Sequence, residues 1–555
     1  MPRRDPAALW LVLVAAVPAS AETLLKAAVP ASAETLLKLA SGTVRGHTDL
    51  LSNERYFLGV PFAKPPLGAL RWQPPLQEEP WTGVQDARKY SASCMQASNA
   101  FTVLTKVSED CLYLNIWLPD AKKHPMPSTG YPVMLFFYGG SWETGSAMFP
   151  LYTGKHLAGH GVIAIAANYR LNIFGFLGGE KLRGRDNSTG NFGLLDQRLA
   201  MRWVQRNAAA LSADPARVMI FGESAGGGSV SNHLVRDQSW GLFTRAGMES
   251  GPLADWSAVR MEHAEVTFQY VVGAANCTSR STVAADLQAC LRNVSADALL
   301  EVGRHVPKLH PVDFIDWIPV IDGVELAKQP QDLGNEGHLA PDVPVLLGTN
   351  ANEGTLFTRI PLDANITEYV RYLTDEPIFA GQVDRILAVY NGSATPPQRK
   401  PPASTEWWSA SFLIGDMLMD CAARRTARWL SARPGGNRSA PTFLYHFERK
   451  LALTDAVEAV KRAPYGVFHG SELAFVFHIE ETLLEASERD LATQMGDFWT
   501  QFAKTGRPAD ESTWPAYTKA NDLSLRLNTG SSIALPGLKS DLCDFWDAFE
   551  PSVPP

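Results

Sequence analysis

The sequence predicts an α/β fold with a large, mostly parallel central sheet and helices on both faces. Short apolar runs, typical of buried parallel strands, occupy residues 133–137, 162–167, 218–221 and 345–347. Segments with helical spacing of apolar residues lie at 195–203 and 495–502. Strands that alternate with helices along a chain are typical of α/β architecture.

Each predicted element has a local justification. The four apolar runs are followed by glycines or polar residues, as expected where a buried strand ends. Apolar residues recur every four positions from Leu195 to Trp203, and the second helical pattern stops before Gly506 and Pro508. The Pro-rich segment 396–402 and the Gly435-Gly436 pair are too short to separate domains. We therefore expect one domain, over residues 39–548.

Composition excludes several classes of protein. The 555 residues include 50 Lys and Arg against 58 Asp and Glu, which gives a net charge of −8. No global positive field is present to bind a phosphate backbone, so a nucleic-acid partner is not expected. Hydrophobic residues make up 45% of the chain and charged residues 19%, which is enough apolar surface for one large core and too little charge for a disordered chain.

The N-terminus has the order of a secretory signal peptide. Two arginines precede an apolar run at 7–17 and the small residues Ala19-Ser20-Ala21, which predicts a signal peptide over 1–21. The apolar run is too short to be a comfortable membrane span, although an uncleaved anchor is the alternative. Residues 15–26 recur unchanged as 27–38, so cleavage as late as residue 33 is also consistent with the pattern. Two copies are too few for a repeat fold, and we interpret the second copy as lying outside the fold.

Two further features agree with export to an extracellular, secreted location. Six asparagines lie in N-x-S/T sequons and are candidate glycosylation sites: Asn187, Asn276, Asn293, Asn365, Asn391 and Asn437. The six cysteines, Cys94, Cys111, Cys277, Cys290, Cys421 and Cys543, form an even set without a CxxC pair. In an exported chain this favours disulfides over zinc ligands, and spacing alone leaves 15 pairings open.

The strongest chemical signal is a nucleophile elbow at Ser224. A predicted strand at 218–221 runs into G-x-S-x-G at 222–226 and then into small residues that begin a helix. This turn exposes the serine hydroxyl at the edge of an α/β sheet, and the flanking glycines permit close packing. A neutral serine also needs a general base, itself oriented by a third group. Chain order places both after the serine but leaves many candidates.

Separated motifs give a specific resemblance. The chain resembles the type-B carboxylesterase family through FLGVPFAKPP at Phe57, EDCLYLNIW at Glu109, NYRLNIFGFL at Asn168, GNFGLLDQRLAMRWV at Gly190 and FGESAGG at Phe221. The resemblance runs from about residue 41 to residue 546. It implies an α/β-hydrolase fold and a serine esterase that needs no metal or other cofactor.

The resemblance also implies the partners of Ser224. GTNANEG at 348–354 is similar to the acid-bearing loop of the family, which makes Glu353 the third member of the triad. GVFHGSEL at 466–473 makes His469 the base. His469 would take the proton of Ser224 while Glu353 orients and stabilises the imidazolium.

An oxyanion hole is expected from two segments. The backbone N–H of Ala225 is one donor, and Gly140 and Ser141 are the others. The family usually has three successive glycines where this chain has Gly139, Gly140 and Ser141. A position that requires a positive φ would make serine costly there, yet a backbone donor survives, so we expect activity to persist.

The resemblance selects one set of disulfides and one buried ion pair. It implies that Cys94 pairs with Cys111, Cys277 with Cys290, and Cys421 with Cys543. It also implies a structural ion pair between Arg71 and Glu109.

The substrate class follows from the first disulfide loop. Cholinesterases place a tryptophan there to bind a quaternary ammonium, whereas the loop from Cys94 to Cys111 contains Phe101 and no tryptophan. We therefore expect uncharged carboxylic esters, from small esters to lipids, with Phe101 and Trp142 as candidate substrate contacts. A cholinesterase-like enzyme and a catalytically weak adhesion or binding member of the same fold are the alternatives. The absence of HExxH, CxxC and a convincing GxGxxG argues against a metal or redox enzyme.

Overall fold

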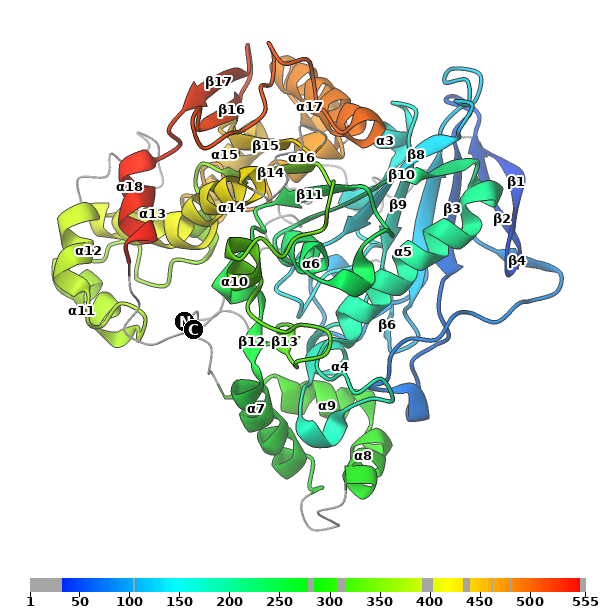
Figure 1. Cartoon of the computed structure of the whole chain (residues 1–555), viewed down its shortest axis with the longest axis horizontal. Helices are drawn as coiled ribbons and strands as arrows, with labels where there is room; N and C mark the ends of the chain where they lie inside the picture. Colours follow the sequence, from blue (N-terminus) through cyan, green and yellow to red (C-terminus); the bar gives the residue numbers. More distant parts are fainter. Residues whose placement is uncertain are drawn as a thin grey trace.

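The computed structural model describes residues 32–549 apart from 103–104, 278–283, 308–315, 392–402, 433–439, 462 and 480. The predicted signal peptide over 1–21 and the sequon asparagine Asn437 lie outside the described residues. A central sheet crosses the molecule, with helices packed against it and with a helical region at each of two corners (Figure 1).

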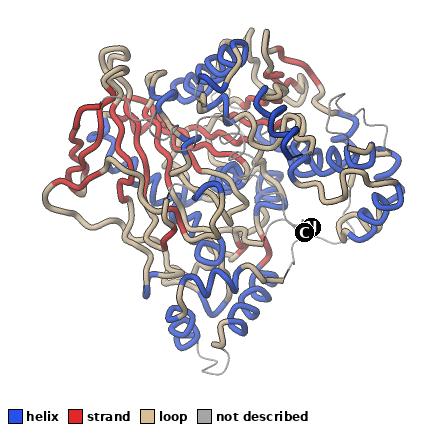
Figure 2. The backbone as a smooth tube through the Cα atoms, turned by 180° about the vertical axis from the view of Figure 1, so that it is seen from behind, coloured by secondary structure: helices blue, strands red, loops and turns tan. Residues whose placement is uncertain are grey.

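The central sheet has thirteen strands. Their order is β1 (Ser32–Leu39), β2 (Gly42–Asp49), β3 (Arg55–Pro61), β7 (Tyr113–Leu118), β9 (Ile163–Ala167), β8 (Tyr131–Phe137), β10 (Ala213–Glu223), β11 (Arg245–Glu249), β14 (Val345–Asn350), β15 (Thr442–Phe447), β16 (Leu523–Leu527) and β17 (Ile533–Pro536), with β4 (Val84–Asp86) beside β2. The strands from β9 to β16 run parallel. The pairs from β1 through β7 to β9 and the pair of β16 with β17 are antiparallel, and β4 runs parallel to β2. The four predicted apolar strands are β8, β9, β10 and β14, and the parallel pairing of this region confirms the expected mostly parallel sheet. Figure 2 shows the strands side by side across the molecule, with helices around them.

Two short strand pairs and the helices complete the described elements. The pairs join β5 (Ser93–Cys94) with β6 (Val107–Ser108) and β12 (Val259–Arg260) with β13 (Val320–Ile321). The helices are α3 (Lys155–Ala158), α4 (Asn172–Phe176), α5 (Phe192–Leu211), α6 (Ala225–Leu234), α7 (Met261–Ala274), α8 (Ala284–Asn293), α9 (Ala296–Gly303), α10 (Pro330–Asn335), α11 (Ile366–Asp375), α12 (Val383–Val389), α13 (Thr405–Gly415), α14 (Cys421–Ser431), α15 (Ala452–Lys461), α16 (Leu473–Val476), α17 (Ala486–Thr505) and α18 (Ser540–Asp547). The two helical patterns predicted from the sequence lie within α5 and α17.

Helices cover both faces of the sheet. Successive residues of a strand point to opposite faces. On β8, the ring of Phe137 faces His233 of α6, whereas the ring of Phe136 lies 4.9 Å from Phe477, which follows α16. Helices α6 and α16 therefore lie on opposite sides of the central strands, and α17 packs against α16.

The first strand corrects two expectations about the N-terminal repeat. Strand β1 pairs with β2 over its whole length and begins at Ser32, before the expected domain start at residue 39. Leu37 and Leu39 are both buried, because alternate residues of this strand point into the core. Residues 32–38 of the second copy thus belong to the sheet, and cleavage after Ala33 would cut into a paired strand.

Covalent links and a buried ion pair follow the implied pattern. The structure contains the disulfides Cys94–Cys111, Cys277–Cys290 and Cys421–Cys543. The guanidinium of Arg71 donates two hydrogen bonds to the Glu109 carboxylate, at 2.7 and 2.5 Å. Five of the sequon asparagines are exposed: Asn187, Asn276, Asn293, Asn365 and Asn391. Within the described ranges, no helix combines the length and apolar character needed to cross a membrane.

Candidate active site

The nucleophile elbow joins β10 to α6. Ser224 stands between them with φ 56° and ψ −125°, a strained conformation for a residue other than glycine. A Cβ atom on Gly226 would collide with the carbonyl oxygen of Phe137, which explains the glycine after the serine. The N–H of Ser224 donates to the carbonyl oxygen of Glu249 at 2.8 Å. The turn is therefore packed against both neighbouring strands, β8 and β11.

The candidate residues gather at one edge of the sheet. Strands β8, β10, β11, β14 and β15 are consecutive and parallel, so their carboxyl ends meet at the same edge. The oxyanion segment follows β8, Ser224 follows β10, and Glu353 follows β14. His469 comes from the longer connection after β15. Parallel pairing thus brings together residues that are far apart in the sequence.

Glu353 and His469 form a buried hydrogen-bonded pair. The Glu353 carboxylate lies 2.6 Å from His469 Nδ1, and both residues are almost fully buried. The other carboxylate oxygen accepts hydrogen bonds from the Ser250 hydroxyl at 2.5 Å and from the Asn350 N–H at 2.7 Å. These contacts hold the carboxylate in one orientation, so that the imidazole keeps its proton on Nδ1 and presents Nε2 as a base.

The second nitrogen of His469 faces the elbow. Nε2 lies 3.3 Å from Glu223 Oε1, on the residue directly before Ser224. Among the described residues, no hydrogen bond joins this nitrogen to the Ser224 hydroxyl. Burial lowers the pKa of His469, but the negative charges of Glu223 and Glu353 outweigh it, and the pKa is raised. The histidine is therefore a stronger base than an ordinary imidazole.

The segment after β8 lies against the elbow. A Cβ atom on Gly139 would come within 2.8 Å of the Ser224 Cβ, so only glycine fits there. Gly140 has φ 111° and Ser141 has φ 57°, so the position at which the sequence departs from the family pattern does require the left-handed region. Within the described part, no acceptor is found for the N–H groups of Gly140, Ser141 or Ala225. These three N–H groups stay the predicted donors of the oxyanion hole.

Comparison with known proteins identifies the family of the chain. The model of the carboxylesterase family matches residues 33–546. The chain belongs to the carboxylesterase family. It is 33% identical to the acetylcholinesterase of Electrophorus electricus, over 90% of this chain and 85% of that protein. It is 32% identical to the cholinesterase of Mus musculus, over 90% of this chain and 83% of that protein. It is 30% identical to the acetylcholinesterase of Bungarus fasciatus, over 92% and 86%. The chain therefore has the α/β-hydrolase fold of a family of serine hydrolases that act on carboxylic esters.

In this member of the carboxylesterase family, three further carboxyl groups surround the pair. Burial, together with the charge of Glu353, raises the pKa of Glu223 to about 7 against the opposing charge of His469. Burial raises the pKa of Glu249 to about 8, although the indole N–H of Trp499 donates to its carboxylate at 2.7 Å. Burial also raises the pKa of Glu472 well above its usual range. At neutral pH the cluster therefore holds protons and carries less negative charge than its composition suggests.

Sequence reasoning missed the roles of Glu223 and Glu472. Both were within reach of a local signal, because Glu223 lies inside the G-x-S-x-G motif and Glu472 lies in the motif that carries His469. Asn350 donates to the Glu472 carboxylate, which connects this group to the loop of Glu353. Spacing along the chain did not indicate that the charges of Glu223 and Glu472 would both interact with Glu353.

The two predicted aromatic substrate contacts have different outcomes. Trp142 is fully buried and its indole packs against Trp256 and Phe176, which contradicts a role in contacting substrate in this family member. The indole N–H donates to Ser229 Oγ at 2.9 Å, so burial leaves this polar group paired. Phe101 is 7% exposed and packs edge-on against Phe149 within the first disulfide loop, and its contact with substrate stays a prediction.

Proposed function

We propose that this chain is a secreted serine carboxylic ester hydrolase that acts on uncharged esters through an acyl-enzyme. The observation that carries the proposal is the buried 2.6 Å hydrogen bond between Glu353 and His469 beside the elbow of Ser224. This arrangement contains a nucleophile, a base and a group that orients the base. Family membership supports the reaction class.

The geometry supports a two-step mechanism. His469 Nε2 takes the proton of Ser224 as its oxygen attacks the ester carbonyl, and Glu353 stabilises the imidazolium. The N–H groups of Gly140, Ser141 and Ala225 donate to the negative oxygen, each contributing about 3 kcal/mol of transition-state stabilisation. The carbon–oxygen bond to the alcohol breaks as His469 returns the proton to the leaving oxygen. Water, activated by the same histidine, then releases the acid and restores the serine.

Secretion is supported by the covalent chemistry of the chain. Three disulfides are typical of an oxidising compartment, and the N-terminal pattern is that of a signal peptide. Exposed sequon asparagines are accessible to glycans. Expression in a eukaryotic secretory host should give protein in the medium whose mass falls on treatment with peptide-N-glycosidase. Retention of all the protein inside the cells would contradict this part of the proposal.

The substrate class can be tested directly. Purified protein and its Ser224→Ala variant are assayed with p-nitrophenyl esters of increasing acyl length, and the acyl length of highest kcat/KM separates esterase from lipase action. We expect turnover that depends on Ser224 and a clear preference within the series. Turnover equal to that of the variant would favour the adhesion or binding alternative.

A cholinesterase-like activity is the second candidate, because the relatives above are named as cholinesterases. Acetylthiocholine and its neutral 3,3-dimethylbutyl analogue differ in charge but hardly in shape. We expect the two thioesters to be hydrolysed with similar kcat/KM, because the first disulfide loop offers no tryptophan for a cation–π contact. A hundredfold preference for acetylthiocholine would establish the cholinesterase alternative instead.

A further inference from the structure

The two halves of the candidate oxyanion hole meet at one buried hydroxyl. Ser229, on α6, accepts a hydrogen bond from the indole N–H of Trp142 at 2.9 Å. The same hydroxyl donates to the carbonyl oxygen of Ala225 at 2.8 Å. Trp142 directly follows Ser141, and Ala225 is the donor on the other side of the hole. One side chain is therefore bonded to both segments that carry the donors.

The backbone conformation of Ser141 and Trp142 must be stabilised by contacts from outside this segment. Ser141 has φ 57° and Trp142 has φ 54°, so two successive residues with side chains occupy the left-handed region. Each costs about 1 to 2 kcal/mol relative to the right-handed conformation. Such a conformation persists only where surrounding contacts impose it. The buried indole, bonded to Ser229 and packed against Trp256, is a contact that can do so.

Ser229 is itself fixed by a chain of hydrogen bonds. Gln197 Nε2 donates to the Ser229 hydroxyl at 3.1 Å, and Gln197 Oε1 lies 3.0 Å from His233 Nε2. A hydroxyl has one donor and two acceptor positions. The contacts with Ala225, Trp142 and Gln197 fill all three, so the Ser229 hydroxyl has no freedom to turn.

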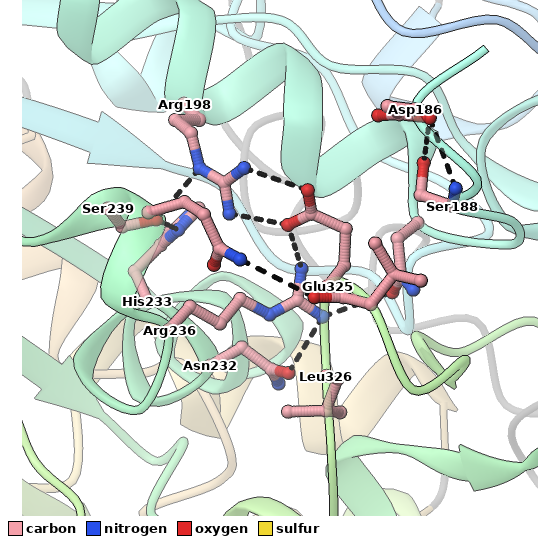
Figure 3. A network of polar contacts seen from close by, with 12 residues as sticks. Asp186, Ser188, Arg198, Asn232, His233, Arg236, Ser239, Glu325 and Leu326 are labelled. Carbon is pink, nitrogen blue, oxygen red and sulfur yellow. Dashed lines mark hydrogen bonds and ion pairs between the residues drawn. The ribbon is translucent and has the colours of Figure 1, made fainter. Parts of the chain in front are cut away.

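The chain of hydrogen bonds continues from His233 through Ser239 to a buried arginine (Figure 3). Arg198 Nε donates to Ser239 Oγ at 3.0 Å, and this hydroxyl lies 2.9 Å from His233 Nδ1. Gln197 Oε1 can only accept, so the proton of the neutral His233 ring lies on Nε2, and Nδ1 accepts from the Ser239 hydroxyl. Burial and the charges of Arg198 and Arg236 hold the pKa of His233 well below its usual range, so the ring stays neutral.

The chain of hydrogen bonds ends in a buried cluster of charged side chains. Arg198 pairs with Glu325 through two hydrogen bonds, at 3.0 and 2.6 Å, and Arg236 lies 3.7 Å from the same carboxylate. Both arginines and the glutamate are at least nine-tenths buried. The network thus joins α5, α6 and the segment after β13 beneath the candidate active site.

We propose that Ser229 is a positioning residue that locks the two halves of the oxyanion hole together through Trp142 and Ala225. The inference rests on the proposed esterase function and assigns to Trp142 a role behind the site in place of a substrate contact. Ser229 touches no reacting atom, and its effect is on where the donors of Ser141 and Ala225 lie when negative charge develops.

The test compares Ser229→Ala, Trp142→Phe and the double variant in the full-length protein. Each change removes one partner of the hydrogen bond. With p-nitrophenyl butyrate, and with active sites counted by titration with an organophosphate, we expect kcat per active site to fall about tenfold in each variant. KM should stay within twofold, because the contact acts on the transition state. The double variant should lose no more than either single one, since both remove the same interaction.

A trifluoromethyl ketone, which binds as a tetrahedral adduct, reports on the hole itself. Its affinity should fall about tenfold in the same variants. Ser231→Ala is the matched control, because Ser231 is a buried serine on the same helix and its hydroxyl donates, among the described residues, to the carbonyl of Gly228 alone, at 2.8 Å. This control should leave kcat and ketone affinity within twofold.

The outcomes separate the inference from the function on which it rests. If Ser229→Ala and Trp142→Phe lower only the melting temperature, with kcat per active site and ketone affinity unchanged, the positioning role is wrong. Additive losses in the double variant would also contradict it. If turnover persists in Ser224→Ala, the proposed function itself fails, whatever the Ser229 variants do.

Discussion

The substitution Glu223→Gln should move the acid limb of the pH profile to lower pH. His469 must be neutral to act as a base, so kcat/KM falls as the pH drops through its pKa. The charge of Glu223, whose oxygen lies 3.3 Å from His469 Nε2, contributes to raising that pKa. An amide of the same shape removes the charge and leaves the packing in place.

The distance between Glu223 and His469 sets an upper limit on the change in the pKa of His469. Two unit charges 3.3 Å apart attract by about 5 kcal/mol at an effective dielectric constant of about 20. At about 1.4 kcal/mol per unit, this is an upper limit of about 3.7 pKa units. Burial raises the pKa of Glu223 itself to about 7, so its charge is only partly present where the histidine titrates. We therefore expect the acid limb to move down by about 1 to 2 units.

The assay is kcat/KM for p-nitrophenyl acetate from pH 5 to 9, read at the isosbestic wavelength of p-nitrophenol. Glu249→Gln is the control, because this carboxyl group is bonded to Trp499 and is not among the charges that raise the pKa of His469. We expect its acid limb to move by less than about 0.5 unit. An acid limb that is unmoved or raised in Glu223→Gln would refute the electrostatic reasoning.

Three other predictions follow from the structure. Glu353→Gln should lower kcat by about a thousandfold or more with little change in KM, since the amide cannot stabilise the imidazolium; steady-state kinetics that show less than a tenfold loss would contradict this. Ser141→Gly should shift the acyl-length preference and change kcat for a small ester by less than tenfold, and a thousandfold change in kcat would contradict this. The same variant should raise the free energy of unfolding by less than about 1 kcal/mol, because relief of the positive φ is offset by the entropy of glycine. Replacing Cys421 and Cys543 by serine opens a link across 122 residues and should cost about 2 to 5 kcal/mol in urea unfolding, whereas an unchanged midpoint would show that the link adds no stability.

The sequence predicted the parts of the site that depend on local pattern. The elbow at Ser224 was recognisable because a buried strand, two glycines and a helix start are all encoded within a few residues of it. Glu353 and His469 were identified only through family motifs, because parallel pairing of β10, β14 and β15 brings them near Ser224 from distant parts of the chain. Their hydrogen bond to each other is a tertiary property.

Other features could not be predicted because they depend on packing. Trp142 reads equally well as a substrate contact or as a core residue in the sequence, and its place is set by tertiary contacts with Ser229, Trp256 and Phe176. The segment 27–38 looks like a copied leader, yet its residues 32–38 pair with β2 and bury Leu37. The pKa values of the carboxyl cluster arise from burial, which spacing along the chain does not reveal.

The most direct test of the account is covalent labelling with a fluorophosphonate, followed by peptide mass spectrometry. We predict a single adduct on Ser224, formed rapidly in the unmodified protein and at least a hundredfold more slowly in His469→Ala, because the serine is nucleophilic only with its base. Labelling of another residue, or labelling of Ser224 at the same rate without His469, would contradict the catalytic arrangement.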